Sequence, residues 1–327
     1  MSGTGTPSLR AWWAQRPPAA GAAVMATGIA STGLHLTGYD VLSGILLAVA
    51  GITWLALAAD FAARLLGDRP RWLREAGTPA ALTAVAATTV LGTRLSAQNW
   101  QHLAEALLAV AALLWPVLIV IVVTHWRERM PGAVFLACVA TEGLAVLGGT
   151  LAKVEGAAWL GHAAMVLFWL GLVLYAFALT RFDFRQLWEG AGDHWLAAGA
   201  LASGALAGSR LIAADSPALY LWNADDRGVL RSVTGALLTL DLVLYAVLLA
   251  AEVARPRLGY DVRRWATVFP MGMTATAMLS VGTAMDISWL RTPAEVLLWV
   301  AVAAWLAVAA GAVEGAWRAL RAPEPSP

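Results

Sequence analysis

Four ionisable residues stand out in this sequence because each lies inside a long apolar segment or near its end. Glu142 lies in the middle of one segment, and Arg94, Lys153 and Arg210 each lie near the end of one. An ionisable side chain at membrane depth is costly and usually serves a purpose. Cations grouped at one end of a pore would concentrate anions, although each would also complement the C-terminal end of its own helix. The pattern favours an anion as the species that is moved.

Glu142 has two interpretations that the sequence leaves open. It lies in the segment Ala-Thr-Glu-Gly, where it could line a pore as a proton-coupling or substrate-sensing group. It could equally be a buried carboxylate that is protonated or hydrogen-bonded to a neighbouring hydroxyl.

Other chemistry has little support in the sequence. The histidines are not spaced as metal ligands, and Cys138 is the one cysteine, so no metal site is expected. No nucleophile elbow, phosphate-binding loop or paired-carboxylate motif occurs. We therefore expect no catalytic residue and no cofactor. An intramembrane enzyme or sensor, with residues converging from different helices, is kept as the less favoured alternative.

The composition indicates which elements position these residues. Of the 327 residues, 60% are hydrophobic, 30 are Gly and only 13% are charged. Soluble domains carry about 25% charged residues, so a soluble protein of this size is excluded. The net charge of +1 gives no reason to expect nucleic-acid binding. The sequence predicts an all-α integral membrane protein whose surface contacts lipids.

Ten apolar stretches are long enough for a transmembrane helix, which needs roughly 20 residues. They lie near residues 19–38, 41–66, 78–96, 102–125, 132–153, 156–180, 194–213, 230–253, 265–285 and 294–318. The predicted organisation is an N-terminal segment (1–18), a ten-helix domain (19–318) and a tail (319–327). On this topology, 16 of the 22 Lys and Arg residues fall on the side of both termini and six on the other. The bias predicts a multi-pass protein of the cell membrane with both termini in the cytoplasm.

The ten predicted helices alternate in composition. Gly, Ala, Ser and Thr fill 53 of 85 central positions in the odd-numbered helices and 32 of 90 in the even-numbered ones. Small residues allow close helix contacts, whereas bulky apolar residues suit the lipid surface. We expect five helical hairpins around a central pore, with the odd helices inside and the even helices outside. The alternative is tight packing of small residues without a pore.

Two segments resemble a known family. Residues 18–31 read Pro-Ala-Ala-Gly-Ala-Ala-Val-Met-Ala-Thr-Gly-Ile-Ala-Ser, and residues 265–273 read Trp-Ala-Thr-Val-Phe-Pro-Met-Gly-Met. Both resemble signatures of the tellurite-resistance/dicarboxylate transporter family, which includes malic acid transporters and the plant slow anion channel. Ala26 stands where the family commonly has Gly, and the seventh helix lacks the proline that recurs in the family's pore helices.

The resemblance implies a homotrimer with a pore in each protomer, lined by the odd helices. It implies that Phe269 plugs the pore, and Pro270 after it would favour a kink that turns the ring toward the axis. The candidates for pore lining or kinking are Pro270, Gly28, Thr27, Glu142 and Gly272.

We therefore expect a channel or transporter for small anions of the chloride, nitrate or C4-dicarboxylate type. The first alternative is a proton-coupled C4-dicarboxylate or malate transporter that uses Glu142. Under the main hypothesis, Arg94, Lys153 and Arg210 form a positive outer vestibule.

Overall fold

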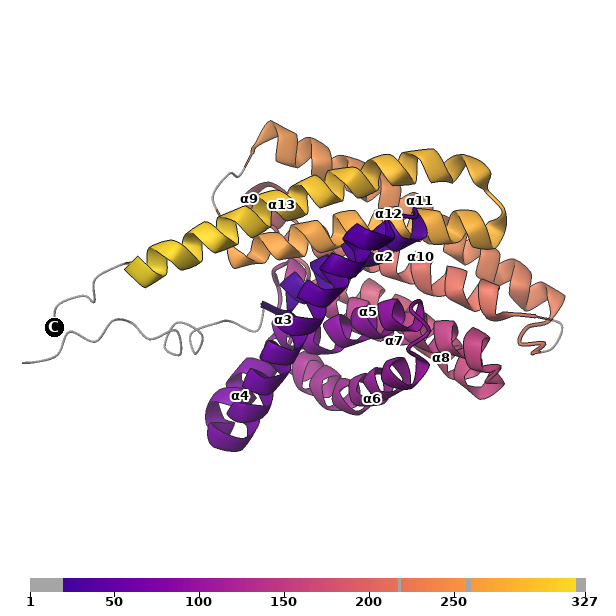
Figure 1. Cartoon of the computed structure of the whole chain (residues 1–327), viewed down its shortest axis with the longest axis horizontal. Helices are drawn as coiled ribbons and strands as arrows, with labels where there is room; N and C mark the ends of the chain where they lie inside the picture. Colours follow the sequence, from indigo (N-terminus) through magenta and orange to yellow (C-terminus); the bar gives the residue numbers. More distant parts are fainter. Residues whose placement is uncertain (1–19, 217–218, 257–259, 322–327) are drawn as a thin grey trace, which may run out of the picture.

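The computed structural model describes residues 20–216, 219–256 and 260–321, and within these ranges it is built from helices and short 3-10 turns without a strand (Figure 1). The predicted N-terminal segment 1–18 and most of the predicted tail lie outside the described residues. Ten of the helices have at least 14 residues and divide into two sets by burial.

The first set, the inner helices, forms a closed ring. Each inner helix contacts the next along the chain, and the last one returns to the first. Nearly all of their residues are buried, including 13 of 16 in the first and 13 of 14 in the second. The inner helices are α2 (Gly21–Leu36), α5 (Thr83–Ser96), α7 (Leu136–Glu155), α10 (Leu196–Ala214) and α12 (Trp265–Met285).

The second set, the outer helices, covers the ring. The buried share of the most apolar stretch is 17% in the first outer helix and 22% in the third, against 94% in the middle inner helix. Each outer helix contacts the inner helix that precedes it in the chain. The outer helices are α3 (Asp40–Gly67), α6 (Gln101–Thr124), α8 (Ala158–Arg181), α11 (Ala224–Ala254) and α13 (Arg291–Arg321).

The inner helices are parallel, because their N-terminal ends meet at one end of the ring. A methyl group at Gly21 would collide with Thr83, at the starts of α2 and α5. A methyl group at Gly132 would collide with the backbone of Asp193, beside the starts of α7 and α10. Residue 192, beside α10, likewise approaches Thr267 near the start of α12. The four later inner helices each begin after a 3-10 turn, at Pro79–Leu82, Gly132–Phe135, Asp193–Trp195 and Val262–Arg264.

Two short helices lie between the long ones. α4 (Arg69–Ala76) follows α3, and α9 (Gln186–Glu189) precedes α10. α4 begins where the sequence supplies both a cap and a start signal: the Asp68 carboxylate accepts a hydrogen bond from the Arg71 backbone N–H at 3.1 Å, and Pro70 occupies the first turn. In Figure 1 α4 lies at the end of α3, away from the ring.

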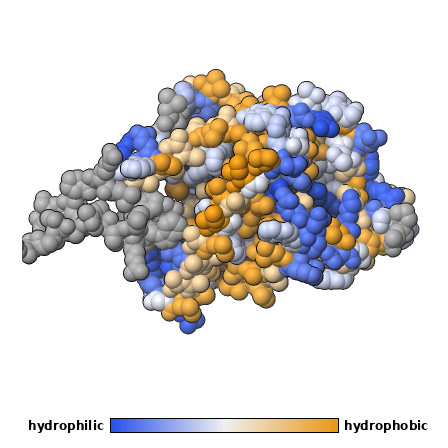
Figure 2. Space-filling view, viewed as in Figure 1, coloured by the Kyte–Doolittle hydropathy of each residue, from blue (hydrophilic) through white to orange (hydrophobic). Residues whose placement is uncertain are grey.

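The outer surface and the helix lengths are those of a multi-pass membrane protein. Figure 2 shows apolar residues over the middle of this face and hydrophilic residues gathered toward the right. Within the described residues, eight helical segments are long and apolar enough to cross a membrane. The other two predicted spans correspond to α2 and α5, which have 16 and 14 residues and many Thr, Ser and Gly side chains. Burial of α2 and α5 within the ring removes the need for a strongly apolar surface.

Candidate functional site

A small cavity lies on the axis of the ring, and all five inner helices contribute to it. Its volume is about 20 Å³, which is close to the space that one water molecule occupies. We call it the axial cavity. Its lining residues are Ile29, Thr32, Thr89, Val90, Thr93, Gly143, Val146, Leu206 and Met273.

Phe269 lies on the face of α12 that is turned toward this axis. Consecutive residues of a helix are about 100° apart, so Phe269 and Met273 share a face one turn apart. Met273 lines the axial cavity. Met271 points the opposite way and packs with residues of α11 and α13. Phe269 has no solvent-accessible surface.

The residues beside Phe269 hold α12 against both neighbours in the ring. A methyl group at Gly272 would come within 2.9 Å of the Ile29 side chain on α2. A methyl group at Gly199 on α10 would come within 2.8 Å of the Pro270 ring. The helix continues through Pro270. Pro270 and Gly272 are therefore contact positions between helices, and Phe269 lies on the arc between them.

The two family-signature candidates on α2 lie beside the axis, outside the cavity lining. The Thr27 hydroxyl donates to the Ala23 carbonyl at 2.7 Å and accepts from the Trp305 indole N–H at 2.9 Å. Thr27 therefore faces the outer helix α13. A methyl group at Gly28 would come within 2.8 Å of Val90, so Gly28 allows α2 and α5 to approach closely. The axis-facing residues of α2 are Ile29 and Thr32.

Glu142 is fully buried, and its carboxylate points toward α8 and α10. A methyl group at Gly171 on α8 would collide with the carboxylate, and one at Gly204 on α10 would lie 3.6 Å from its Oε1. Neither carboxylate oxygen has a hydrogen-bond partner within the part of the chain that the structure describes. It is the next residue, Gly143, that lines the axial cavity.

Lys153 and Arg210 lie between the axial cavity and the C-terminal ends of the inner helices. Arg210 is one turn beyond Leu206 on α10, and Lys153 is two turns beyond Val146 on α7, so both share the face of a cavity-lining residue. Lys153 is exposed and Arg210 is partly buried. Neither forms an ion pair with a described residue.

Arg94 was expected to join Lys153 and Arg210 in a positive outer vestibule. Its side chain instead turns away from the axis and is fully buried. Its Nη2 donates to the Ser43 hydroxyl at 2.8 Å, and its Nε lies 3.2 Å from the hydroxyls of both Ser31 and Ser43. The two serines donate to each other's carbonyl oxygens at 2.8 and 2.7 Å, which leaves their lone pairs for the guanidinium. With its amide oxygen turned toward Arg94, Gln98 accepts at 2.7 and 3.1 Å.

Sequence reasoning missed the residues that line the axial cavity. Thr89 and Thr93 are one turn apart on α5, and this spacing of hydroxyls could have identified an axis-facing stripe. Their hydroxyls donate to carbonyls of their own helix at 2.9 Å. The two threonines therefore present oxygen lone pairs and methyl groups to the axis, and no O–H donor. Among the described residues, no group of three or more His, Cys, Asp and Glu side chains is placed to hold a metal ion.

The comparisons with known proteins agree with this architecture. A sequence model of the family described as voltage-dependent anion channel matches residues 15–313, which is most of the chain and includes both family-like segments. Among curated proteins none matches. The family match confirms the resemblance to the tellurite-resistance/dicarboxylate transporters and supports a role in moving anions across a membrane. The chain belongs to the voltage-dependent anion channel family.

Proposed function

We propose that this protein is a channel or transporter that passes small anions along the axis of the inner ring, with Phe269 as the gate. The proposal includes ten membrane spans, arranged as five helical hairpins around one pore in each protomer. The observation that carries it is the axial cavity, because all five inner helices line it. A passage through the centre of each protomer requires such a shared lining, whereas packing between neighbouring helices would involve two or three of them.

The charges around the axis support an anion as the substrate. Lys153 and Arg210 lie on axis-facing sides without ion-pair partners among the described residues. Arg94 lies behind them; its hydrogen-bond partners are neutral oxygen atoms, and no carboxylate of the described chain lies within ion-pair distance of it. Buried charges act at longer range than exposed ones because less water screens them. All three favour anions at that end of the axis.

The same geometry supports a closed state and a gate at Phe269. The axial cavity holds about one water molecule, and its lining offers no fixed charge and no free hydroxyl proton. An anion entering it would lose hydration without receiving new ligands, which is the basis of an apolar gate. The aromatic ring of Phe269 lies one turn from Met273 on the same face and would extend this barrier.

The test is Phe269→Ala, with Met271→Ala as the matched control. Both residues are buried on α12, but Met271 faces the outer helices. In proteoliposomes, we expect Phe269→Ala to raise the flux of chloride, nitrate or malate sharply, and Met271→Ala to leave it unchanged. A packing role for Phe269 would instead lower stability by about 3–5 kcal/mol without any gain in flux, and that result would remove the gate.

A second candidate function is proton-coupled transport of C4-dicarboxylates through Glu142. The observation that favours it is the buried carboxylate with both oxygen atoms unpartnered in the described chain. Against it, the carboxylate lies between α7, α8 and α10, beside the axis. Flux that depends on an imposed pH gradient, and loses this dependence in Glu142→Gln, would favour the coupled mechanism. An intramembrane enzyme or sensor receives no comparable support.

The proposal also covers assembly and orientation. We place the protein in the cell membrane as a homotrimer with both termini in the cytoplasm, so the ends of the inner helices that carry Lys153 and Arg210 face outward. The family membership and the distribution of basic residues support this arrangement.

A further inference from the structure

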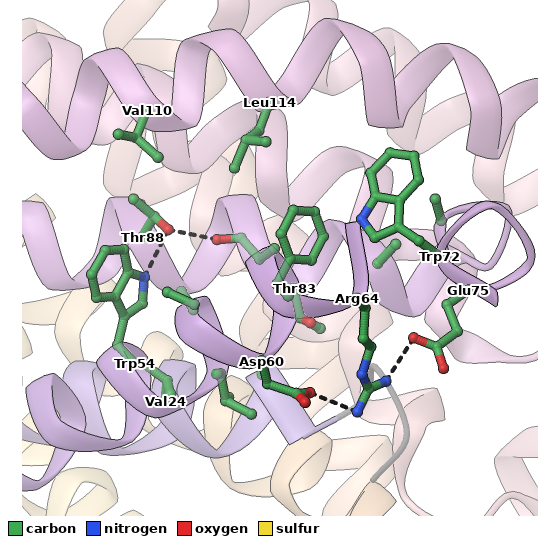
Figure 3. A pocket seen from close by; sticks show the side chains of 18 of the residues that line it. Val24, Trp54, Asp60, Arg64, Trp72, Glu75, Thr83, Thr88, Val110 and Leu114 are labelled. Carbon is green, nitrogen blue, oxygen red and sulfur yellow. Dashed lines mark hydrogen bonds and ion pairs between the residues drawn. The ribbon is translucent and has the colours of Figure 1, made fainter. Parts of the chain in front are cut away.

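A second, larger cavity lies at the periphery of the ring, between the outer helices α3 and α6 (Figure 3). Its volume is about 400 Å³, within the range of small-molecule binding sites. α3 and α6 form its walls, α5 forms its floor, and α4 closes one end. Val110 and Leu113 of α6 are exposed and also line it, so the cavity reaches the lipid-facing surface. We call it the lateral pocket.

The lateral pocket has the length of one leaflet of the membrane. Its lining residues on α3 run from Trp54 to Arg64. Ten residues of α-helix correspond to about 15 Å, which is half of a hydrocarbon core of about 30 Å. The pocket therefore extends from the α4 end of α3 to about the middle of that helix, which corresponds to one leaflet when α3 spans the bilayer.

The polarity of the pocket changes along this length. At the deep end, the Trp54 indole N–H donates to the Thr88 hydroxyl at 2.9 Å (Figure 3). Because this donor is satisfied, Trp54 offers the pocket only the apolar surface of its ring. Leu57, Phe61 and Leu114 line the middle. At the α4 end, Arg64 pairs with Asp60 at 2.6 Å and with Glu75 at 2.7 Å. An apolar stretch that ends in a polar group matches an acyl chain attached to a headgroup.

Two donors without hydrogen-bond or ion-pair partners in the described chain lie at the α4 end. The Trp72 indole N–H lines the pocket and is buried without a hydrogen-bond partner among the described residues. Arg69 is exposed, has no ion-pair partner in the described chain, and lies about 60° around α4 from Trp72. Arg74 is exposed too but lies on the opposite face of α4. An indole N–H and a free guanidinium on one face would bind a phosphate group.

We propose that the lateral pocket binds one anionic phospholipid, with an acyl chain along α5 and the phosphate at Trp72 and Arg69. The apolar walls and the opening toward the bilayer favour a lipid chain as the occupant, and the leaflet-length geometry sets its direction. The free cation on the pocket side of α4 gives the preference for an anionic headgroup. This binding goes beyond the proposed transport function and does not depend on it.

The test is native mass spectrometry of the purified full-length protein with added phosphatidylglycerol or phosphatidylcholine. We expect retained phosphatidylglycerol to exceed retained phosphatidylcholine. Ala58→Phe would fill the pocket from α3 and remove this retained lipid. Ala59→Phe is the matched control, because Ala59 is exposed and does not line the pocket.

The headgroup contact has its own matched pair of variants on α4. Arg69→Gln should weaken the preference for phosphatidylglycerol several-fold, because it removes a charge-assisted hydrogen bond to the phosphate. Arg74→Gln, on the opposite face of the same helix, should change the preference much less. Equal losses from the two variants would indicate only diffuse attraction to the membrane surface and would overturn the specific site.

Other occupants give different results. If the pocket were a contact between copies of the chain, Ala58→Phe would change the oligomer mass and leave lipid retention unaltered. If residues of the N-terminal segment filled it, deletion of residues 2–16 would raise lipid retention in the wild-type background. Either result would overturn the proposal, as would equal retention of the two lipids in all variants.

Discussion

Arg94 carries a positive charge into the protein interior without a carboxylate within ion-pair distance among the described residues. The hydroxyls of Ser31 and Ser43 and the amide of Gln98 satisfy its N–H groups. Hydrogen bonds to neutral oxygen atoms stabilise the guanidinium, yet they leave its net charge in place. This arrangement ties α5 to α2 and α3 and also keeps a positive potential behind the axis. Lys153 and Arg210, by contrast, hold no helix in place through such bonds.

This difference predicts separate outcomes for the cations. Combined Lys153→Gln and Arg210→Gln should lower anion flux most at low ionic strength, since salt screens their field over about 10 Å at 0.1 M. The melting temperature should stay close to that of the wild type, because neither side chain has an ion-pair partner in the described chain. Flux measured in proteoliposomes across a salt series checks this.

Arg94→Gln provides the contrast to that double variant. It removes both the charge and the shared donor for two buried serines, so it should lower the melting temperature. If the double variant left flux unchanged at every salt concentration, Lys153 and Arg210 would only complement the ends of their helices.

The direction of individual side chains could not be predicted from the sequence. Thr27 and Glu142 were both candidates for pore lining, yet Thr27 faces Trp305 and Glu142 faces Gly171. An inner helix is buried on every side and an outer helix is apolar on every side, so neither has the polar stripe that fixes its rotation. Pro270 and the family signature marked Phe269 as a candidate, but its direction follows only from Met273, which lines the axial cavity one turn away.

At the scale of elements, α4 is held to α3 by an ion-pair network. Glu75 accepts from Arg64 at 2.7 Å and from Arg71 at 2.8 Å. Burial raises the pKa of Glu75, but the hydrogen bonds from Arg71 and Arg64 outweigh it and hold the pKa below the ordinary value of 4.5. A lowered pKa means that the contribution to stability is complete above the unfolded-state pKa and is lost as pH falls through the folded-state pKa.

Glu75→Gln should therefore lower the melting temperature at pH 7 by about 2 °C, the size expected for a partly exposed network. The difference from the wild type should shrink at about pH 3, where the wild-type carboxylate is protonated too. Glu295→Gln is the control, because the Arg291–Glu295 pair at 3.0 Å is largely exposed. A difference between Glu75→Gln and wild type that did not change with pH would argue against this network.

The positions of the long helices could be predicted, but the short elements could not. Each of the ten apolar segments overlaps one long helix, although α11 begins at Ala224, six residues before the predicted start. α4 lies in a polar stretch without a long apolar run, whereas the 3-10 turns Pro79–Leu82 and Gly132–Phe135 lie inside predicted spans and could not be told from the helices that follow them. Burial also depends on neighbours from distant parts of the chain, so the residues that line the axial cavity could not be identified from the sequence.

At the scale of the whole molecule, the basic residues predict the orientation. Cysteines introduced as Gly3→Cys and Ser326→Cys should react with an impermeant thiol reagent only after the cells are permeabilised. Cys138 is the one native cysteine and is buried, so the background is low. Labelling of either position in intact cells would contradict cytoplasmic termini and reverse the direction assigned to Lys153 and Arg210.

The parallel inner helices restrict how such a protein can move its substrate. Some transporters are built from two inverted repeats, which are related by a two-fold axis in the membrane plane. When the two repeats exchange conformations, the outward-facing state becomes the inward-facing one. Five helices that all point the same way contain no such pair of halves. One mouth of the axis is made of helix N-termini, and the other of C-termini with Lys153 and Arg210. If anions pass along this axis, as we propose, opening would come from local displacements along it, and the two directions of travel would be inequivalent.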